Sequence, residues 1–172
     1  MRDYKIGSSK REDVDALPEI ERRAARLFSP EDLAPELATE TTPVLVYLRA
    51  HDEGRLIVAR DASERVVGFA HLVWIGKFAH LEEIDVDSDF GRRGIGRMLV
   101  EAACEWARAR GSDQITLSTF RDVAWNAPFY ARLGFRTLLE DELSIALRDL
   151  RTKERGEGLD SEKRVMMSRS LT

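Results

Sequence analysis

The sequence predicts an α/β fold in which helices flank a mixed sheet, and two observations support this prediction. Short apolar runs typical of strands alternate along the chain with segments of helical periodicity. The clearest helical segment, residues 94–110, lies between two such runs at residues 78–86 and 115–120. A length of 172 residues without an internal repeat or low-complexity tract predicts one domain over residues 1–172.

The remaining elements follow from periodicity and from residues that begin or end helices. Ser29-Pro30 and Thr42-Pro43 each predict a helix start, because Ser or Thr is a good N-cap and Pro suits the first turn. The charged stretch 148–163 predicts a helix and a loop. The predicted strands are residues 4–7, 55–60, 66–75, 78–86, 115–120, 138–139 and 165–167, and the helical patterns cover residues 13–28, 94–110 and 126–133.

Three acids interrupt the predicted strand 78–86. A central strand covered on both faces should be almost entirely apolar, and a violation of such a rule is expected at a functional site. The alternative is that the acids lie where the strand is splayed or exposed. Strict alternation predicts that one face carries His80, Glu82, Ile84 and Val86, and the other Leu81, Glu83 and Asp85.

The run V-D-S-D-F-G-R-R-G-I-G-R at residues 86–97 is the most informative segment. A glycine-rich turn between a strand and a helix N-terminus exposes unpaired N–H groups, and the helix dipole adds about half a positive charge. Gly94 and Gly96 allow a phosphate to approach the backbone closely. The alternative is a tight connection with solvated arginines. Neither the Walker pattern nor the dinucleotide pattern G-x-G-x-x-G is present, so a nucleotide-dependent enzyme is disfavoured.

Two motifs together resemble the GNAT superfamily of acyl-CoA-dependent N-acetyltransferases. That family carries Q/R-x-x-G-x-G/A after its fourth strand and a short helix ending in Y-x-x-x-G-F after its fifth. Gly94 and Gly96 match the first motif, and Tyr130, Gly134 and Phe135 match the second. The resemblance therefore implies a GNAT-like domain whose central mixed sheet is mostly antiparallel, with splayed central strands.

The resemblance also implies that acetyl-CoA is the co-substrate. It assigns the pantetheine to the backbone of strand 78–86 and the pyrophosphate to the amides of the glycine turn. The family's Gln or Arg is Gly91 here, and Val123 occupies the usual Asn position, with Asn126 the nearest Asn. The implied cofactor-binding residues are Ile84, Val86, Gly91, Arg92, Arg93, Gly94, Ile95, Gly96, Arg97 and Asn126.

Acetyl transfer to an amine needs a proton acceptor, an oxyanion donor and an acid for the leaving thiolate. The resemblance makes Tyr130 the acid, and a core aromatic packed beside Phe135 is the alternative. For the base, the resemblance favours the face of His80, which makes Glu82 the first candidate and Glu83 the second. One N–H near Val86 is the implied oxyanion donor. The predicted reaction is direct attack by the amine within a ternary complex.

Composition excludes several other classes of function. A net charge of −4 disfavours a nucleic-acid partner, and no apolar run approaches the roughly 18 residues that a membrane span needs. Cys104 is the only cysteine, and the three histidines lack metal-ligand spacing, so we expect no disulfide and no metal. The N-terminus lacks an apolar signal core, which favours the cytoplasm.

The expected partner is a small amine or a peptide, and the local acids favour a cationic one. The sequence names no specific acceptor, and a homodimer stays open. The alternative function is a non-catalytic acyl-CoA-binding or regulatory domain, which the missing Gln/Arg and the displaced Asn favour.

Overall fold

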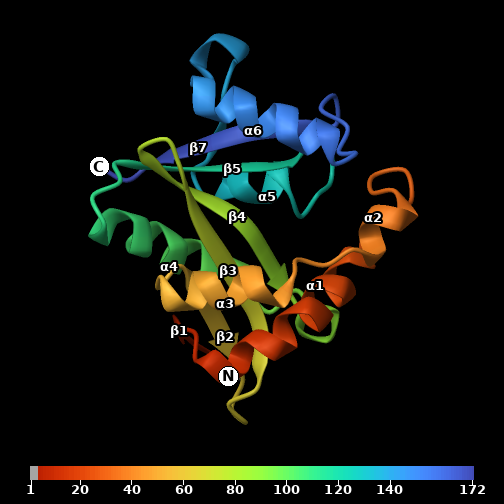
Figure 1. Cartoon of the computed structure of the whole chain (residues 1–172), viewed down its shortest axis with the longest axis vertical. Coiled ribbons are helices and arrows are strands. Elements are labelled where there is room, and N and C mark those ends of the chain that lie inside the picture. The colour runs from red at the N-terminus through yellow and green to blue at the C-terminus, as the bar shows by residue number, and fades with distance from the viewer. Residues whose placement is uncertain (1–3) are drawn as a thin grey trace.

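A seven-stranded sheet with the strand order β1-β2-β3-β4-β5-β7-β6 crosses the computed structural model, which describes residues 4–172 (Figure 1). Neighbouring strands are antiparallel except β4 and β5, which are parallel. The prediction of a mixed, mostly antiparallel sheet is therefore confirmed. The strands are β1 (Lys5–Ser8), β2 (Leu56–Arg60), β3 (Val66–Ile75), β4 (Phe78–Val86), β5 (Gln114–Phe120), β6 (Arg136–Thr137) and β7 (Arg164–Ser170).

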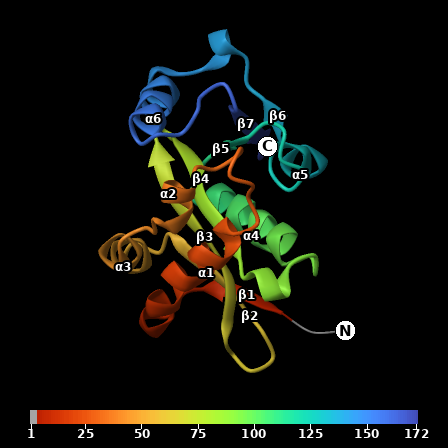
Figure 2. The same ribbon diagram turned by 90° about the vertical axis from the view of Figure 1, so that its right-hand side faces the viewer.

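Helices cover both faces of this sheet (Figure 2). One face carries α4 and α5, and the other carries α1, α3 and α6. On the first face, the buried side chains of α4, including Ile95 and Leu99, pack with Tyr130 of α5 in one apolar cluster. The helices are α1 (Leu17–Ala25), α2 (Pro35–Thr39), α3 (Val44–Asp52), α4 (Ile95–Ala109), α5 (Ala127–Arg132) and α6 (Ile145–Gly156), and a 3-10 helix at Arg11–Ala16 precedes α1.

The two central strands diverge after a short contact. Only residues 79–81 of β4 pair with β5, at residues 115–117, whereas β5 pairs with β7 along its whole length. The last five residues of β4 therefore have no strand partner on the β5 side, which confirms the predicted splay. All three acids of β4 lie in this diverging part.

A bulge in β4 makes one prediction wrong. His71 pairs with Glu83 while the next residue, Leu72, pairs with Leu81, so Glu82 is an extra residue in the ladder. The alternation of faces shifts by one residue after this point. His80, Glu83 and Asp85 share one face, because their partners on β3 are Val73, His71 and Phe69, which alternate regularly.

Ile84 and Val86 lie on the opposite face, under α4, opposite Ala70 and Gly68 of β3. Strict alternation, which places Ile84 and Val86 on the His80 face, is therefore wrong for these two residues, whereas Glu82, the unpaired residue of the bulge, lies 3.9 Å from His80. A bulge adds one residue to a strand and leaves no mark in the pattern of apolar residues along the sequence. Faces assigned by strict alternation are therefore wrong for the paired residues beyond it.

Two further predictions differ from the structure. Ser29-Pro30 begins a turn, closed by Asp32 N donating to Ser29 O and Oγ, and the next helix begins only at Pro35. Proline disfavours helical geometry in the residue before it, and Ala34 is accordingly extended, so no helix continues from Pro30 into α2. The strand predicted at residues 138–139 lies two residues earlier, as β6, although Leu138 N still donates to Met166 O.

Candidate active site

A cavity of about 480 Å³ lies where β4 and β5 diverge. The segment from α1 to α2 forms one wall, β4 and β5 form the floor, and α6 with the loop after it forms the opposite wall. Figure 1 shows this arrangement, with α1 and α2 on one side of β4 and α6 on the other. Apolar side chains line the two walls, namely Ala25, Phe28, Leu33 and Leu37 on one and Leu150 and Leu159 on the other.

Three carboxylates meet on the α1 side of the cavity. Glu83 and Asp85 project from the same face of β4, and Glu21 reaches them from α1. Glu21 is held by Thr42 N, which donates to it over 2.9 Å, and by the Tyr47 hydroxyl, which donates over 2.8 Å. Thr42 Oγ1 lies 3.2 Å from Glu21 and 3.3 Å from Glu83, so it links the two acids.

Burial raises the pKa of each of these carboxyl groups. The pKa of Asp85 is raised to about 7 by burial, with the charge of Glu21 acting in the same direction. Burial, Asp85 and Glu21 together raise the pKa of Glu83 well above its usual value. Asp85 Oδ2 is fully buried and has no hydrogen-bond partner among residues 4–172. Asp85 therefore loses its proton near neutrality, the range in which a general base works best, and the adjacent Glu83 carboxyl has its pKa raised in the same direction.

Glu82 lies apart from this cluster, on the α6 side. Its side chain is 34% exposed to solvent, although partial burial still raises its pKa. The nearest base is His80, with Nε2 3.9 Å from the Glu82 carboxylate. Burial lowers the pKa of His80 to about 3, and its Nδ1 lies 2.8 Å from Thr116 Oγ1. His80 is thus a neutral, hydrogen-bonded structural residue and does not neutralise Glu82.

Tyr130 lines the same cavity from α5. Its ring packs edge-on against Phe129 and Phe135, so it belongs to the apolar core as well as to the cavity. Burial, then the charge of Asp85, raises the pKa of its hydroxyl, so the group is protonated at neutral pH. Asn126 also lines the cavity, and its side-chain oxygen accepts a hydrogen bond of 2.6 Å from Thr119. Val123, at the family's usual Asn position, is buried.

The glycine turn leads from β4 into α4 and presents free amides. Gly94 adopts φ +81°, which L-residues reach only with strain, and Arg92 is held at φ +58°. The first backbone bond of the helix is from Met98 N to Gly94 O. Within the described chain, the amides of residues 95–97 therefore donate to no protein acceptor, as an anion site at a helix N-terminus requires.

The three arginines of this turn differ in their surroundings. Arg93 donates to the Asp89 carbonyl over 2.9 Å and lies over the Phe90 ring, so it braces the turn. Arg92 and Arg97 are exposed and form no hydrogen bond or ion pair with residues 4–172. These two guanidinium groups are consequently available to an anion.

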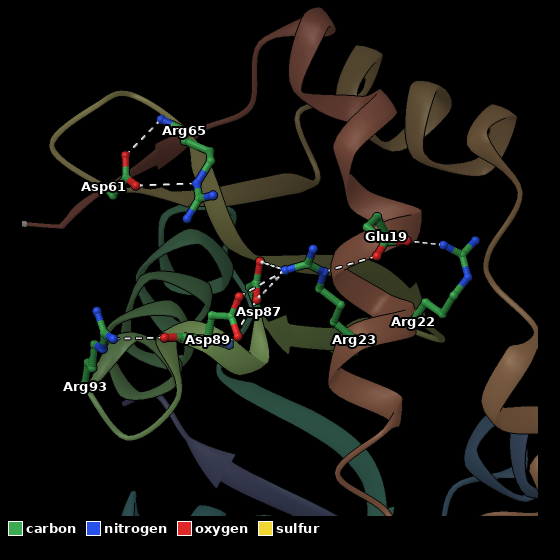
Figure 3. A network of polar contacts seen from close by, with 8 residues as sticks. All are labelled: Glu19, Arg22, Arg23, Asp61, Arg65, Asp87, Asp89 and Arg93. Atoms are coloured by element: carbon green, nitrogen blue, oxygen red, sulfur yellow. Dashed lines mark hydrogen bonds and ion pairs between the residues drawn. The ribbon is translucent and has the colours of Figure 1, made fainter.

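An arginine of α1 fastens that helix to the start of the turn. Arg23 Nη1 lies 3.4 Å from Asp87 and 3.2 Å from Asp89, while its Nε donates to Glu19 (Figure 3). Arg22, by contrast, pairs within residues 4–172 only with Glu19 of its own helix. Arg23 thus couples the position of α1, which carries Glu21, to the turn that presents the free amides.

The family assignment follows from a match to the model of the acetyltransferase (GNAT) family over residues 16–135. The chain belongs to the GNAT family. Its recognition from the glycine turn and the Tyr130 motif is thereby confirmed.

Curated relatives match part of this GNAT chain. It is 36% identical over 90 residues to a mycothiol acetyltransferase of Clavibacter michiganensis, a match covering 52% of this chain and 29% of that protein. It is 33% identical over 87 residues to a glucosamine 6-phosphate N-acetyltransferase of Trypanosoma brucei brucei, with 46% and 57% covered. The matches thus span less than two thirds of these relatives.

Solved structures share the fold over nearly the full length. The PaiA N-acetyltransferase of Thermoplasma acidophilum, solved in complex with coenzyme A, has a TM-score of 0.67 and 18% identity, covering 98% of this chain and 99% of that one. The ribosomal-protein-S18-alanine N-acetyltransferase of Escherichia coli has a TM-score of 0.67 and 19% identity, covering 99% and 95%. At such identities the likeness establishes the fold.

The cavity of this GNAT domain carries more negative than positive charge. Seven acidic and two basic side chains line it. Both cations are already paired, Arg164 with Glu154 at 3.1 Å and Lys153 with Glu157 at 3.7 Å. Among residues 4–172, the other five carboxylates have no ion pair with lysine or arginine; they are Glu21, Glu40, Glu82, Glu83 and Asp85.

Sequence reasoning missed several of these groups. Glu21 lies in a helical pattern where a charge is expected on the solvent side, and nothing local distinguishes it. Arg164 and Glu154 come from β7 and α6, far along the chain from the two motifs. Arg121 and Trp125, between β5 and α5, do not line the cavity, although the Trp125 ring centroid lies 5.7 Å from that of Phe28, which does.

The described part of the structure, residues 4–172, contains neither a cluster of metal-ligating side chains nor a membrane-spanning helix. Within residues 4–172, no three His, Cys, Asp or Glu side chains are grouped to hold a metal ion. None of the described helices has the length and hydropathy needed to cross a bilayer. Cys104 is buried in α4, and burial raises the pKa of its thiol to about 11, so it is a poor nucleophile.

Proposed function

We propose that this protein is an N-acetyltransferase that transfers the acetyl group of acetyl-CoA to a primary amine. The single observation that supports it most is the meeting of Tyr130 with the Glu83–Asp85 pair at one cavity, beside the splay of β4 and β5. An acid and a base are thus placed at the same cavity, directly before the glycine turn. Curated relatives that carry acetyltransferase names, and a fold neighbour solved with coenzyme A, support the same activity.

The residues of the turn fit a phosphorylated co-substrate. The turn forms a cationic site that consists largely of main-chain groups. It combines free amides at residues 95–97, Gly94 in the left-handed conformation, and the unpaired guanidinium groups of Arg92 and Arg97. In our proposal the amides from Gly91 to Arg97 hold the pyrophosphate. The backbone of Ile84 and Val86, beyond the splay, holds the pantetheine arm, with Asn126 nearby.

The reaction joins the amine nitrogen to the thioester carbon and breaks the carbon–sulfur bond. The Glu83–Asp85 pair accepts the proton that the amine loses, and the Tyr130 hydroxyl donates a proton to the departing sulfur. A backbone N–H near Val86 donates to the carbonyl oxygen as its charge develops. We place Glu83 before Glu82 as the base, because Glu83 lies beside Asp85 and is linked to Glu21 through Thr42, whereas Glu82 lies apart from them, toward α6.

The decisive experiment mixes the protein with acetyl-CoA and a panel of amines and follows free CoA thiol. We expect thiol release that depends on both substrates, with acetylated amine found by mass spectrometry. The second candidate is a non-catalytic acyl-CoA-binding domain, which Gly91 and the buried Val123 favour. A thermal shift with CoA but no thiol release with any amine would establish that candidate and overturn ours.

A cytoplasmic location belongs to the same proposal. The single cysteine and the use of acetyl-CoA both favour it. Fluorescence of a tagged full-length chain in its host tests this location, and signal confined to the cell envelope would contradict it.

A further inference from the structure

We propose that the acceptor is an aliphatic diamine, and that Glu82 binds its second ammonium group while the Glu83–Asp85 pair receives the amine that is acetylated. This inference rests on the proposed function and names the substrate class of the same site. The observation behind it is the presence of two acidic sites without a lysine or arginine partner in one cavity whose side walls are apolar.

The first acidic site requires a hydrogen-bond donor. Asp85 Oδ2 is fully buried without any partner in residues 4–172, and Asp85 lines the cavity. A buried acceptor without a partner loses its hydration with no compensation. An amine bound here supplies the missing N–H, and the neighbouring Glu83 accepts the proton that it must lose before attack.

The second acidic site is created by the bulge. Glu82 is the extra residue in β4, and its side chain lies toward α6, where the charges of Lys153, Glu154 and Arg164 act on it. The cations on that side are Lys153 and Arg164, and each already pairs with a glutamate of α6. Glu82 itself meets only the neutral His80, at 3.9 Å. A second ammonium group therefore finds an unneutralised carboxylate there.

Apolar side chains flank the two sites on both walls of the cavity. Phe28, Leu33 and Leu37 line one wall, and Leu150 and Leu159 line the other. A chain of methylene groups packs well on such walls, whereas a sugar ring would place hydroxyl groups against them. A phosphorylated amino sugar is further disfavoured by the five unpaired carboxylates, so we do not extend the substrate of the Trypanosoma relative to this chain.

The test compares diaminobutane and diaminopentane with butylamine and pentylamine, using acetyl-CoA and the full chain. A charge-assisted hydrogen bond at Glu82 should give the diamines a kcat/KM at least about tenfold above that of the matched monoamines. In Glu82→Gln this ratio should fall close to one. Glu105→Gln is the control, since it removes one exposed charge from the outer side of α4 and should leave the ratio unchanged.

A binding measurement keeps the inference testable without turnover. Diaminopentane should raise the Tm of the CoA complex more than pentylamine does, and Glu82→Gln should abolish that difference. Equal turnover and equal Tm shifts for diamines and monoamines would overturn the diamine inference and leave the acetyltransferase intact. A basic peptide acetylated better than any diamine would also overturn it. No thiol release with any acceptor, by contrast, would refute the proposed function itself.

Discussion

In the proposed mechanism the hydroxyl of Tyr130 is the acid, whereas its ring packs in the core, and substitution separates the two. Tyr130→Phe keeps the edge-on contacts with Phe129 and Phe135. It removes only the proton donor, so we expect kcat to fall about a hundredfold, with CoA affinity nearly unchanged. Steady-state kinetics and CoA titration check this. An unchanged kcat, where chemistry is rate-limiting, would make Tyr130 a core aromatic only.

The two neighbouring glutamates of β4 should differ in their effect on the pH profile. A general base acts in its proton-free form, so the rate should fall as pH drops below the apparent pKa of the Glu83–Asp85 pair, near neutrality. Glu83→Gln should lower kcat about a hundredfold for every amine and remove this limb. Glu82→Gln should retain the limb. The reverse result would restore Glu82 as the base.

The unpartnered Asp85 should cost stability at higher pH. Burial raises its pKa from 3.8 to about 7, so its contribution to stability is present below the unfolded pKa and is lost as pH rises through about 7. Asp85→Asn cannot ionise and should raise the Tm at pH about 8 by at least about 2 °C, and by less at pH about 5. Asp149→Asn, on the exposed surface of α6, is the matched control. An equal gain at both pH values would exclude this titration.

At the scale of elements, two glycines of one turn should respond differently to alanine. Gly94 lies in the left-handed region, so Gly94→Ala should cost about 1 kcal/mol of unfolding free energy. Gly96 is helical, and an added Cβ would meet only Phe129, at 3.6 Å. Gly96→Ala should therefore keep the Tm and weaken CoA binding, because its methyl group covers the free amides. Denaturant unfolding and CoA titration distinguish the two, and unchanged CoA affinity in Gly96→Ala would contradict the phosphate assignment.

The elements that sequence predicted well are those defined by local periodicity. The amphipathic pattern at 94–110 gave α4, and the two motifs gave the turn and α5, because backbone conformation there depends on nearby residues. The bulge at Glu82 was not predictable, since it depends on how β3 pairs with β4 and leaves no mark on composition. The faces of Ile84, Asp85 and Val86 consequently required the structure.

The helix predicted at Ser29-Pro30 shows a similar limit. Its start signals are genuine, since Ser29 does accept from Asp32 N, but a single turn satisfies them. The second proline, Pro35, then sets where α2 begins. Start signals identify a capped turn, and whether a helix continues depends on the residues that follow.

At the scale of the whole molecule, the cavity between α1 and α6 and the glycine turn after β4 are separate parts of the proposed site. The distance between them must stay fixed for the two substrates to meet. Most of the cavity is formed by residues that are distant from one another in sequence, such as Glu21, Asp85, Tyr130 and Arg164. Their meeting depends on helix docking, which no local pattern records. The Arg23 clamp between α1 and the turn after β4 is the most direct connection between the two parts (Figure 3).

Loss of this clamp should alter substrate binding more than stability. Arg23 is 36% exposed on its side chain, so solvent screens its ion pairs and they should contribute little to the free energy of unfolding. Arg23→Ala should nonetheless raise the KM for the amine and for acetyl-CoA together, because it frees the helix carrying Glu21 and removes a support of the turn. Arg22→Ala is the control, since Arg22 pairs, among the described residues, only with Glu19 within α1.

Kinetics in both substrates, with Tm measured in parallel, separate these outcomes. A rise in only one KM would show that the clamp serves a single part of the site. A large drop in Tm with unchanged KM values would show that Arg23 stabilises the fold alone. Because Asp87 is largely buried whereas Asp89 is exposed, we expect Asp87→Asn to reproduce the Arg23→Ala effect more fully than Asp89→Asn does.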